Sequence, residues 1–270
     1  MECHMNKLAS VRIIYLIFVL LLSLVTQIAA ATGSDVAKER RWAEQVVDGL
    51  LDGDDVWLDD GDGHDFLGIF TEAESGPGNA VLLLHGSGAH PNWPDVMYPL
   101  RQGLFEHGIT TLSIQMPILA NSAEPSEYGP LYTEVPSRLD ASISYLTDAG
   151  YTSFSIIGHS SGATMAAYYL SRDSGHKINS FIAIGIPGLP GSGINNYIAL
   201  ENISVPILDL YGSDDLEQVL NTAELRAAAA NKRPGRNYLQ LKVDGANHFF
   251  QGSESVLVKH VIEWLDRQSK

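Results

Sequence analysis

The hydrophobic pattern is most regular from Asn79 to the end of the chain, where short apolar runs alternate with longer segments of helical periodicity. Six apolar runs have the length of strands, at residues 80–84, 111–115, 154–157, 180–184, 206–211 and 238–243. Helices are expected between them, at about 95–107, 136–149, 161–172, 217–231 and 254–268. Near-continuous apolar strands separated by helices predict an α/β fold with a parallel sheet that is covered on both faces.

The segment before Asn79 is less regular. Residues 34–50 have apolar positions at helical spacing and predict a surface helix, and 66–71 could add an antiparallel edge strand. Residues 52–65 contain seven aspartates mixed with glycines, a composition typical of turns. A calcium loop is the alternative, but the spacing does not match the EF-hand pattern. No repeat or low-complexity linker divides the chain, so we expect residues 32–270 to form a single domain.

The N-terminal segment resembles an export signal. Two basic residues precede an apolar run at 13–25, and three alanines follow at 29–31. This order predicts that residues 1–31 are a signal peptide, and hence that the protein is exported to the periplasm or secreted. The alternative is an uncleaved anchor, because residues 8–31 are long enough to cross a bilayer as a helix.

Composition narrows the choice of partners. The chain carries 17 Lys and Arg against 32 Asp and Glu, a net charge of −15, which disfavours nucleic acid, anionic membrane surfaces and anionic substrates. Membrane contact is therefore expected only through an uncleaved N-terminus. The single cysteine, Cys3, cannot form an internal disulfide or a zinc finger.

A nucleophile motif follows the third predicted strand of this region. The pattern G-x-S-x-G occupies residues 158–162, between the apolar run at 154–157 and a predicted helix. Glycine is needed on both sides of the serine because the sharp strand-to-helix turn leaves no room for side chains. Ser160 is therefore the candidate nucleophile, placed at a helix N-terminus where developing negative charge is favoured.

A base and an acid are found after later strands, at the same edge of the sheet. His248 lies in the loop before the last helix and is the candidate general base. Two aspartates follow the strand at 206–211: we prefer Asp215, three residues after a glycine, as the partner of the histidine, with Asp214 as the alternative. The chain order serine, aspartate, histidine is that of the α/β-hydrolases.

The sequence HGSG at 85–88 follows the strand at 80–84 and is the candidate oxyanion loop. The N–H groups of Ser87 and Ser161 are the expected oxyanion donors. His85 and His90 could also be imagined as metal ligands, but no third ligand stands in register and no HExxH helix is present, so no metal is expected.

These motifs, with the segments SIIGHSSGA, ILDLYGSDD and GANHFF, resemble the α/β-hydrolase superfamily, and more narrowly a group of exported proteobacterial α/β-hydrolase-like proteins of unassigned function. The resemblance implies an eight-stranded, mostly parallel sheet, no cofactor, and a Ser-His-Asp triad at Ser160, His248 and Asp215. One departure is the HGSG loop, where many lipases and esterases have HGGG, so no preference among ester types carries over.

The expected function is that of an esterase-like serine hydrolase acting on a small-molecule or lipid-like acyl substrate. An acyltransferase with the same triad and a non-catalytic binding protein on a hydrolase scaffold are the alternatives. Residues 116–136, too long for a plain connection, are expected to form a small loop lid, and 186–197 the other wall of the cleft. Tyrosines and aliphatic residues in the lid would either face the substrate or pin the loop to the core.

Overall fold

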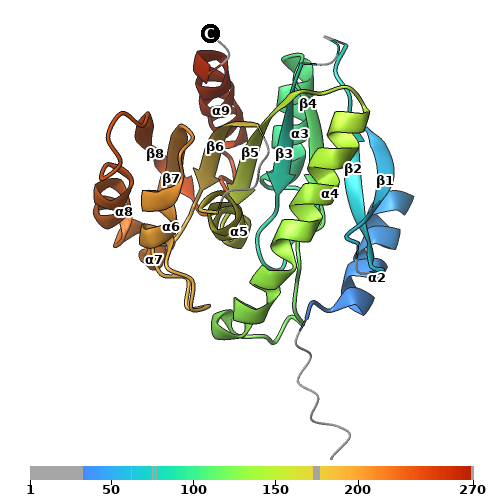
Figure 1. Ribbon diagram of the computed structural model, residues 1–270, viewed down its shortest axis with the longest axis horizontal. Helices are drawn as coiled ribbons and strands as arrows, with labels where there is room; N and C mark the ends of the chain where they lie inside the picture. The colour runs from blue at the N-terminus through green and yellow to red at the C-terminus, as the bar shows by residue number, and fades with distance from the viewer. Residues whose placement is uncertain (1–32, 62, 75, 77, 173–176, 269–270) are drawn as a thin grey trace, which may run out of the picture. The chain divides into compact units, whose positions relative to one another are not determined.

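The computed structural model describes residues 33–61, 63–74, 76, 78–172 and 177–268 (Figure 1). The predicted signal peptide and anchor lie outside these residues. From Gly33 onward the chain forms one compact unit. Within the described ranges, no helix combines the length and apolar character needed to span a membrane.

Eight strands in the described residues form one sheet in the order β1-β2-β4-β3-β5-β6-β7-β8. Their bounds are β1 Asp54–Asp59, β2 Asp65–Thr71, β3 Asn79–Leu84, β4 Thr110–Ile114, β5 Ser153–His159, β6 Ile178–Ile184, β7 Ile207–Asp214 and β8 Tyr238–Asn247. Strands β3 to β8 are parallel, whereas β2 is antiparallel to both β4 and β1. The predicted eight-stranded, mostly parallel sheet is thus confirmed.

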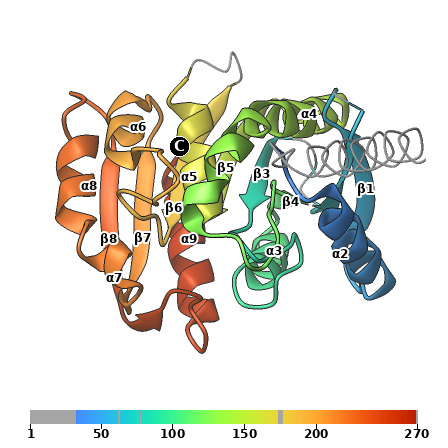
Figure 2. The ribbon, with the colours of Figure 1, turned by 90° about the horizontal axis from the view of Figure 1, so that it is seen from below.

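Helices cover both faces of the sheet. Their bounds are α2 Val36–Asp48, α3 Met97–Glu106, α4 Val135–Asp148, α5 Ser161–Leu170, α6 Asn196–Asn202, α7 Glu217–Leu220, α8 Ala223–Ala230 and α9 Glu254–Gln268, with a 3-10 helix, η1, at Pro125–Thr133. Because side chains alternate along a strand, Leu82 and Leu84 of β3 pack with α4, α5 and α6, whereas Val81 and Leu83 pack with α3 and α9. Figure 2 shows these two helical layers on opposite sides of the strands. Helix α2 packs on Leu67 and Ile69 of β2.

Three elements were not predicted, and one of them is the 3-10 helix η1, inside the segment predicted as a loop lid. The composition at 52–65 predicts turns, but Asp54–Asp59 forms the edge strand β1, in which buried Leu58 lies between exposed Trp57 and exposed Asp59. Helix α6 lies at the end of the segment predicted as a loop wall and is capped by Asn195, whose side chain accepts from the N–H groups of Tyr197 and Ile198. The predicted helix at 217–231 is interrupted between α7 and α8.

A buried ion pair supports β7, the strand that leads to the candidate acid. Arg226 of α8 donates to both carboxylate oxygens of Asp209 at 2.8 and 3.2 Å, and both side chains are fully buried. Tyr238 and Gln240 of β8 donate to the same carboxylate, each at 3.0 Å. This ion pair fixes α8 against β7. The parallel pairing of β3, β5, β6, β7 and β8 places the carboxyl ends of these strands along one edge of the sheet, where the candidate site lies.

Candidate active site

Ser160 lies on a sharp turn between β5 and α5. Its φ of 54° and ψ of −119° are sparsely populated for a residue with a side chain. The turn is held by its own backbone: the Ser160 N–H donates to the carbonyl of Ile184 at 2.8 Å, and the Ser160 carbonyl accepts from Thr164. This is the geometry expected of a nucleophile elbow, and it leaves the Ser160 side chain only partly buried.

The glycines of the motif make this turn possible. A Cβ at Gly162 would lie 2.3 Å from the carbonyl oxygen of Leu84, and one at Gly158 would lie 2.6 Å from the backbone of Ala163. Both positions exclude any side chain, which is the steric reason for the G-x-S-x-G spacing.

His248 and Asp215 complete a continuous hydrogen-bonded chain with Ser160. The Nε2 atom of His248 lies 3.0 Å from Ser160 Oγ, and Nδ1 lies 2.6 Å from Asp215 Oδ1. Because a carboxylate can only accept, Nδ1 carries the proton and Nε2 is left to accept from the serine hydroxyl. The structure thus brings together the serine, histidine and aspartate that the sequence singled out.

The loop geometry distinguishes the two neighbouring aspartates. Asp215 is buried, and its Oδ1 also accepts from the Leu216 N–H at 2.7 Å. Asp214 is exposed, and its carboxylate accepts from Ser213 instead of reaching the histidine. Asp215, the preferred candidate, is therefore the acid in contact with His248.

The predicted oxyanion donors lie beside the nucleophile. Ser87, Ser160 and Ser161 line the same pocket. The main-chain N–H groups of Ser87 and Ser161 have no acceptor among the described residues. Ser161 is the first residue of α5, so its N–H also benefits from the helix dipole.

Two residues that sequence reasoning did not single out position the histidine. His159, buried inside the elbow, donates from Nε2 to the carbonyl oxygen of His248 at 2.9 Å. Burial lowers the pKa of His159 to about 4, which keeps the ring neutral. Gly185, with a φ of +59°, follows β6; a Cβ there would lie 2.9 Å from the His248 ring. A glycine directly after an apolar strand was the available signal for Gly185.

His85 ties the candidate oxyanion loop to the segment that follows β4. Its Nδ1 donates to the Gly86 carbonyl at 2.8 Å, and its Nε2 accepts from the Met116 N–H at 2.9 Å. Burial lowers its pKa to about 3. His90, the second histidine considered as a metal ligand, lies between the rings of Trp42 and Trp93. The part of the chain that the structure describes contains no cluster of three His, Cys, Asp or Glu side chains suited to a metal.

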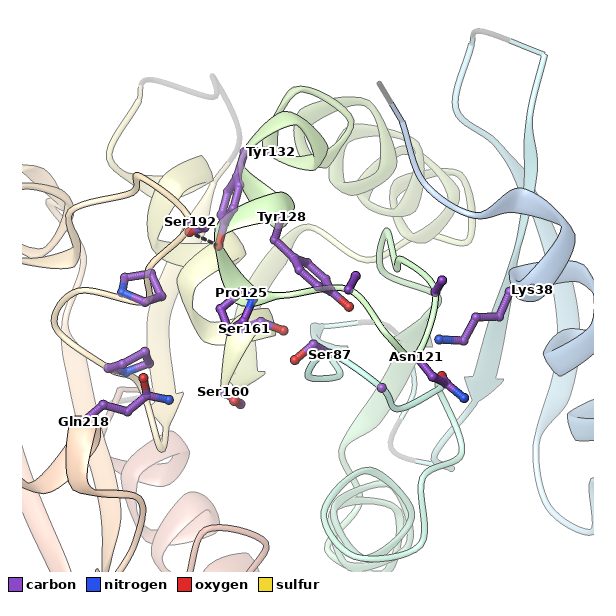
Figure 3. A pocket seen from close by; sticks show the side chains of 15 residues that line it. Lys38, Ser87, Asn121, Pro125, Tyr128, Tyr132, Ser160, Ser161, Ser192 and Gln218 are labelled. Atoms are coloured by element: carbon purple, nitrogen blue, oxygen red, sulfur yellow. Dashed lines mark hydrogen bonds between the residues drawn. The ribbon is translucent and has the colours of Figure 1, made fainter. Parts of the chain in front are cut away.

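A pocket of about 340 Å³ opens above Ser160 (Figure 3). Residues of the predicted lid line it, including Tyr128 and Tyr132 of η1, and Pro187, Pro190 and Ser192 line it from the segment before α6. Both tyrosines also belong to the main core, so they anchor the lid and contact the cavity. Burial raises the pKa of Tyr132 to about 12. Lys38 and Gln218 stand at opposite sides of the cavity in Figure 3.

A family described as a protein of unknown function, DUF3530, matches residues 26–134 and 130–267. The chain belongs to the DUF3530 family. A search of the curated proteins finds no match for this DUF3530 chain.

Solved structures with the same fold include several esterases and hydrolases. Est1E from Butyrivibrio proteoclasticus superposes with a TM-score of 0.64 at 14 % identity, covering 79 % of the DUF3530 chain and 98 % of its own. The Pyrococcus furiosus esterase Pf2001 superposes with a TM-score of 0.64 at 20 % identity, covering 83 % of the DUF3530 chain and 93 % of its own. A dienelactone hydrolase from Anabaena variabilis superposes with a TM-score of 0.62 at 18 % identity, covering 79 % of the DUF3530 chain and 96 % of its own. With its sheet order and helical layers, the DUF3530 chain therefore has the α/β-hydrolase fold.

Proposed function

We propose that this protein is an esterase-like serine hydrolase that cleaves carboxylic esters through an acyl-enzyme. The observation that carries the proposal is the chain of hydrogen bonds from Ser160 through His248 to Asp215. A serine hydroxyl is a weak nucleophile unless a base accepts its proton, and this arrangement supplies such a base in the required tautomer. The esterase and hydrolase neighbours support the same class of chemistry.

In the first half-reaction, Ser160 Oγ attacks the ester carbonyl carbon and its proton passes to His248 Nε2. The carbonyl oxygen becomes an oxyanion that the N–H groups of Ser87 and Ser161 stabilise. The C–O bond to the alcohol then breaks, and the imidazolium returns the proton to the leaving alcohol. Throughout, the Asp215 carboxylate fixes the ring and stabilises its positive charge.

In the second half-reaction, water attacks the acyl-serine while His248 takes its proton. As the second oxyanion collapses, the bond from carbon to Ser160 Oγ breaks, the imidazolium returns the proton to Oγ, and the carboxylic acid is released. The lid tyrosines and two prolines of the opposite wall, Pro187 and Pro190, line the cavity of about 340 Å³ above the serine. A small-molecule or single-chain acyl compound fits this size.

The proposal is tested by trapping the acyl-enzyme. Purified protein is mixed with p-nitrophenyl acetate, quenched in acid, and analysed by peptide mass spectrometry, with S160A as the matched control. We expect a burst of p-nitrophenol and an acetyl group on the peptide carrying Ser160. Absence of both turnover and acylation in the folded wild-type protein would contradict the proposal. Added alcohol acceptors separate hydrolysis from acyl transfer, since a transferase would form a new ester in place of acetate.

We also propose that the protein is exported, on the strength of the signal-like pattern at 1–31. Fractionation of cells that express the full chain, followed by N-terminal sequencing, tests this proposal. A mature N-terminus near residue 31 in the periplasm or medium is expected, whereas an intact N-terminus in the cytoplasm would contradict it.

A further inference from the structure

We propose that Lys38 recognises an anionic group on the substrate, so that the preferred esters carry a carboxylate or similar anion at a distance from the scissile carbonyl. This inference rests on the proposed function and specifies its substrate class. It assigns a role in specificity to a side chain of α2, an element that lies far from the triad in the sequence.

Lys38 reaches the active-site pocket from a buried position. The residue is 5 % exposed, yet it lines the cavity that also contains Ser160 and Ser87. Its Nζ donates to the carbonyl of Leu119 at 2.7 Å and lies 4.5 Å from the centre of the Trp42 ring. In Figure 3 the Lys38 side chain extends toward the cavity on the same side as Asn121.

Lys38 has no ion-pair partner among the described residues. The acidic residues next to it in sequence are otherwise engaged: Asp35 caps α2, and Glu39 pairs with Arg138 at 3.0 Å. Burial lowers the pKa of Lys38, while the nearby carboxylates act in the opposite direction. An ammonium has three donors; the Leu119 carbonyl accepts from one and the Trp42 ring faces the group as well, so at least one donor remains for a ligand.

The charge of the cavity itself points to an anion. Among the described residues that line the pocket, Lys38 alone carries a formal charge, and the others are serines, tyrosines, prolines, amides and small residues. A buried cation without a counter-ion is costly, and an anionic ligand that replaced water there would form a charge-assisted hydrogen bond. The negative charge of the chain as a whole disfavours anionic substrates at long range, but the contacts within the cavity decide which group is bound there.

The test compares esters that differ only in this charge. One series consists of p-nitrophenyl monoesters of dicarboxylic acids of increasing length, and a second consists of carboxyphenyl acetates. Each is paired with a neutral analogue in which a primary amide replaces the carboxylate. The readout is the ratio of kcat/KM for the charged and neutral members of a pair. We expect the best pair to favour the anion by roughly 10- to 100-fold in the wild-type protein.

Three variants assign this preference to Lys38. In K38M the ratio falls to about 1, and in K38R most of it is retained because the charge is kept. N121D changes an exposed lid residue and places a carboxylate on the same side of the cavity as Lys38, so it lowers the ratio. Because N121D keeps Lys38, it still tests the proposal if K38M folds poorly. K259M, which removes an exposed lysine of α9 outside the pocket lining, leaves the ratio as in the wild type.

A binding measurement separates this inference from the proposed function. S160A lacks the nucleophile, so calorimetry can compare the anionic and neutral esters without turnover, in S160A and in S160A/K38M. Tighter binding of the anion that the second substitution abolishes supports the role of Lys38, whether or not the wild type turns over esters. An equal affinity for both esters in S160A, or a charged-to-neutral ratio that K38M leaves unchanged, would overturn it while leaving the acyl-enzyme proposal standing.

Discussion

The contact between Asp215 and His248 makes a quantitative prediction for the substitution D215N. The side chains are isosteric, so the packing of this buried position is preserved. Asp215 Oδ1 accepts hydrogen bonds from both the Leu216 N–H, at 2.7 Å, and His248 Nδ1, at 2.6 Å, so an acceptor oxygen is needed at this position. The asparagine is therefore expected to keep its amide oxygen toward the ring. The tautomer is retained and the negative charge is lost.

The size of the effect follows from the charge that develops during the reaction. When His248 takes the serine proton, its ring and the Asp215 carboxylate form an ion pair, with Nδ1 and Oδ1 at 2.6 Å. With charge centres about 4 Å apart and an effective dielectric constant of about 20, the attraction is about 4 kcal/mol. Since about 1.4 kcal/mol corresponds to a factor of ten, D215N is expected to lower kcat/KM about 1000-fold.

Asp214 provides a matched control one residue away. D214N removes the same charge from an exposed side chain that does not contact the histidine, so kcat/KM should stay within about threefold of the wild-type value. Hydrolysis of p-nitrophenyl acetate by both variants, with thermal melting as the folding check, gives the comparison. A D215N variant within a few-fold of wild type, or a D214N variant as impaired as D215N, would refute the assignment of the acid.

Three further predictions concern stability, each measured by urea unfolding. Burial lowers the pKa of His85 to about 3 and of His159 to about 4, so between pH 6.5 and 4.5 the unfolded chain binds protons that the folded chain does not. As the pH is lowered through this range, the free energy of unfolding should fall by about 2–3 kcal/mol per histidine. A free energy of unfolding that stays constant over this range would contradict the prediction. G162A, whose Cβ would overlap a β3 carbonyl oxygen, should cost about 3 kcal/mol or more, whereas G78A, in open space, should not. R226M leaves a buried carboxylate unpaired and should cost about 3–5 kcal/mol; a loss below 1 kcal/mol would argue against this ion pair.

The central part of the fold could be predicted from the sequence because its strands are buried on both faces. Val81, Leu82 and Leu83 in β3 are almost fully buried, so the run is apolar without alternation and stands out from its surroundings. Edge strand β1 differs, because Leu58 is its one buried residue and three of its six residues are aspartates, which is the composition of a turn. Its signal was the two-residue spacing of Val56 and Leu58, which is too short to outweigh the aspartates and glycines on either side.

The contacts around Ser160 were predictable for a different reason. Ser160, His248 and Asp215 each follow a strand of a parallel sheet, and the carboxyl ends of such strands meet at one edge. Lys38 could not be found in this way, because it lies on α2 and reaches the pocket through a contact with Leu119, 81 residues away. His159 was hidden for a similar reason, since its role depends on the backbone carbonyl of a loop that only the folded sheet brings near.

The proposed nucleophile is tested most directly by labelling the purified protein with a fluorophosphonate probe, which forms a covalent bond only with an activated serine. Labelling is measured for the wild type and for S160A and H248A, with D214N as a control for a change next to the site that does not touch His248, and the modified peptide is identified by mass spectrometry. We expect rapid labelling of Ser160 in the wild type and in D214N, no labelling in S160A, and a large loss of rate in H248A. A folded wild-type protein that takes up no probe, or takes it up equally well without His248, would contradict the proposal that this site is a working serine nucleophile.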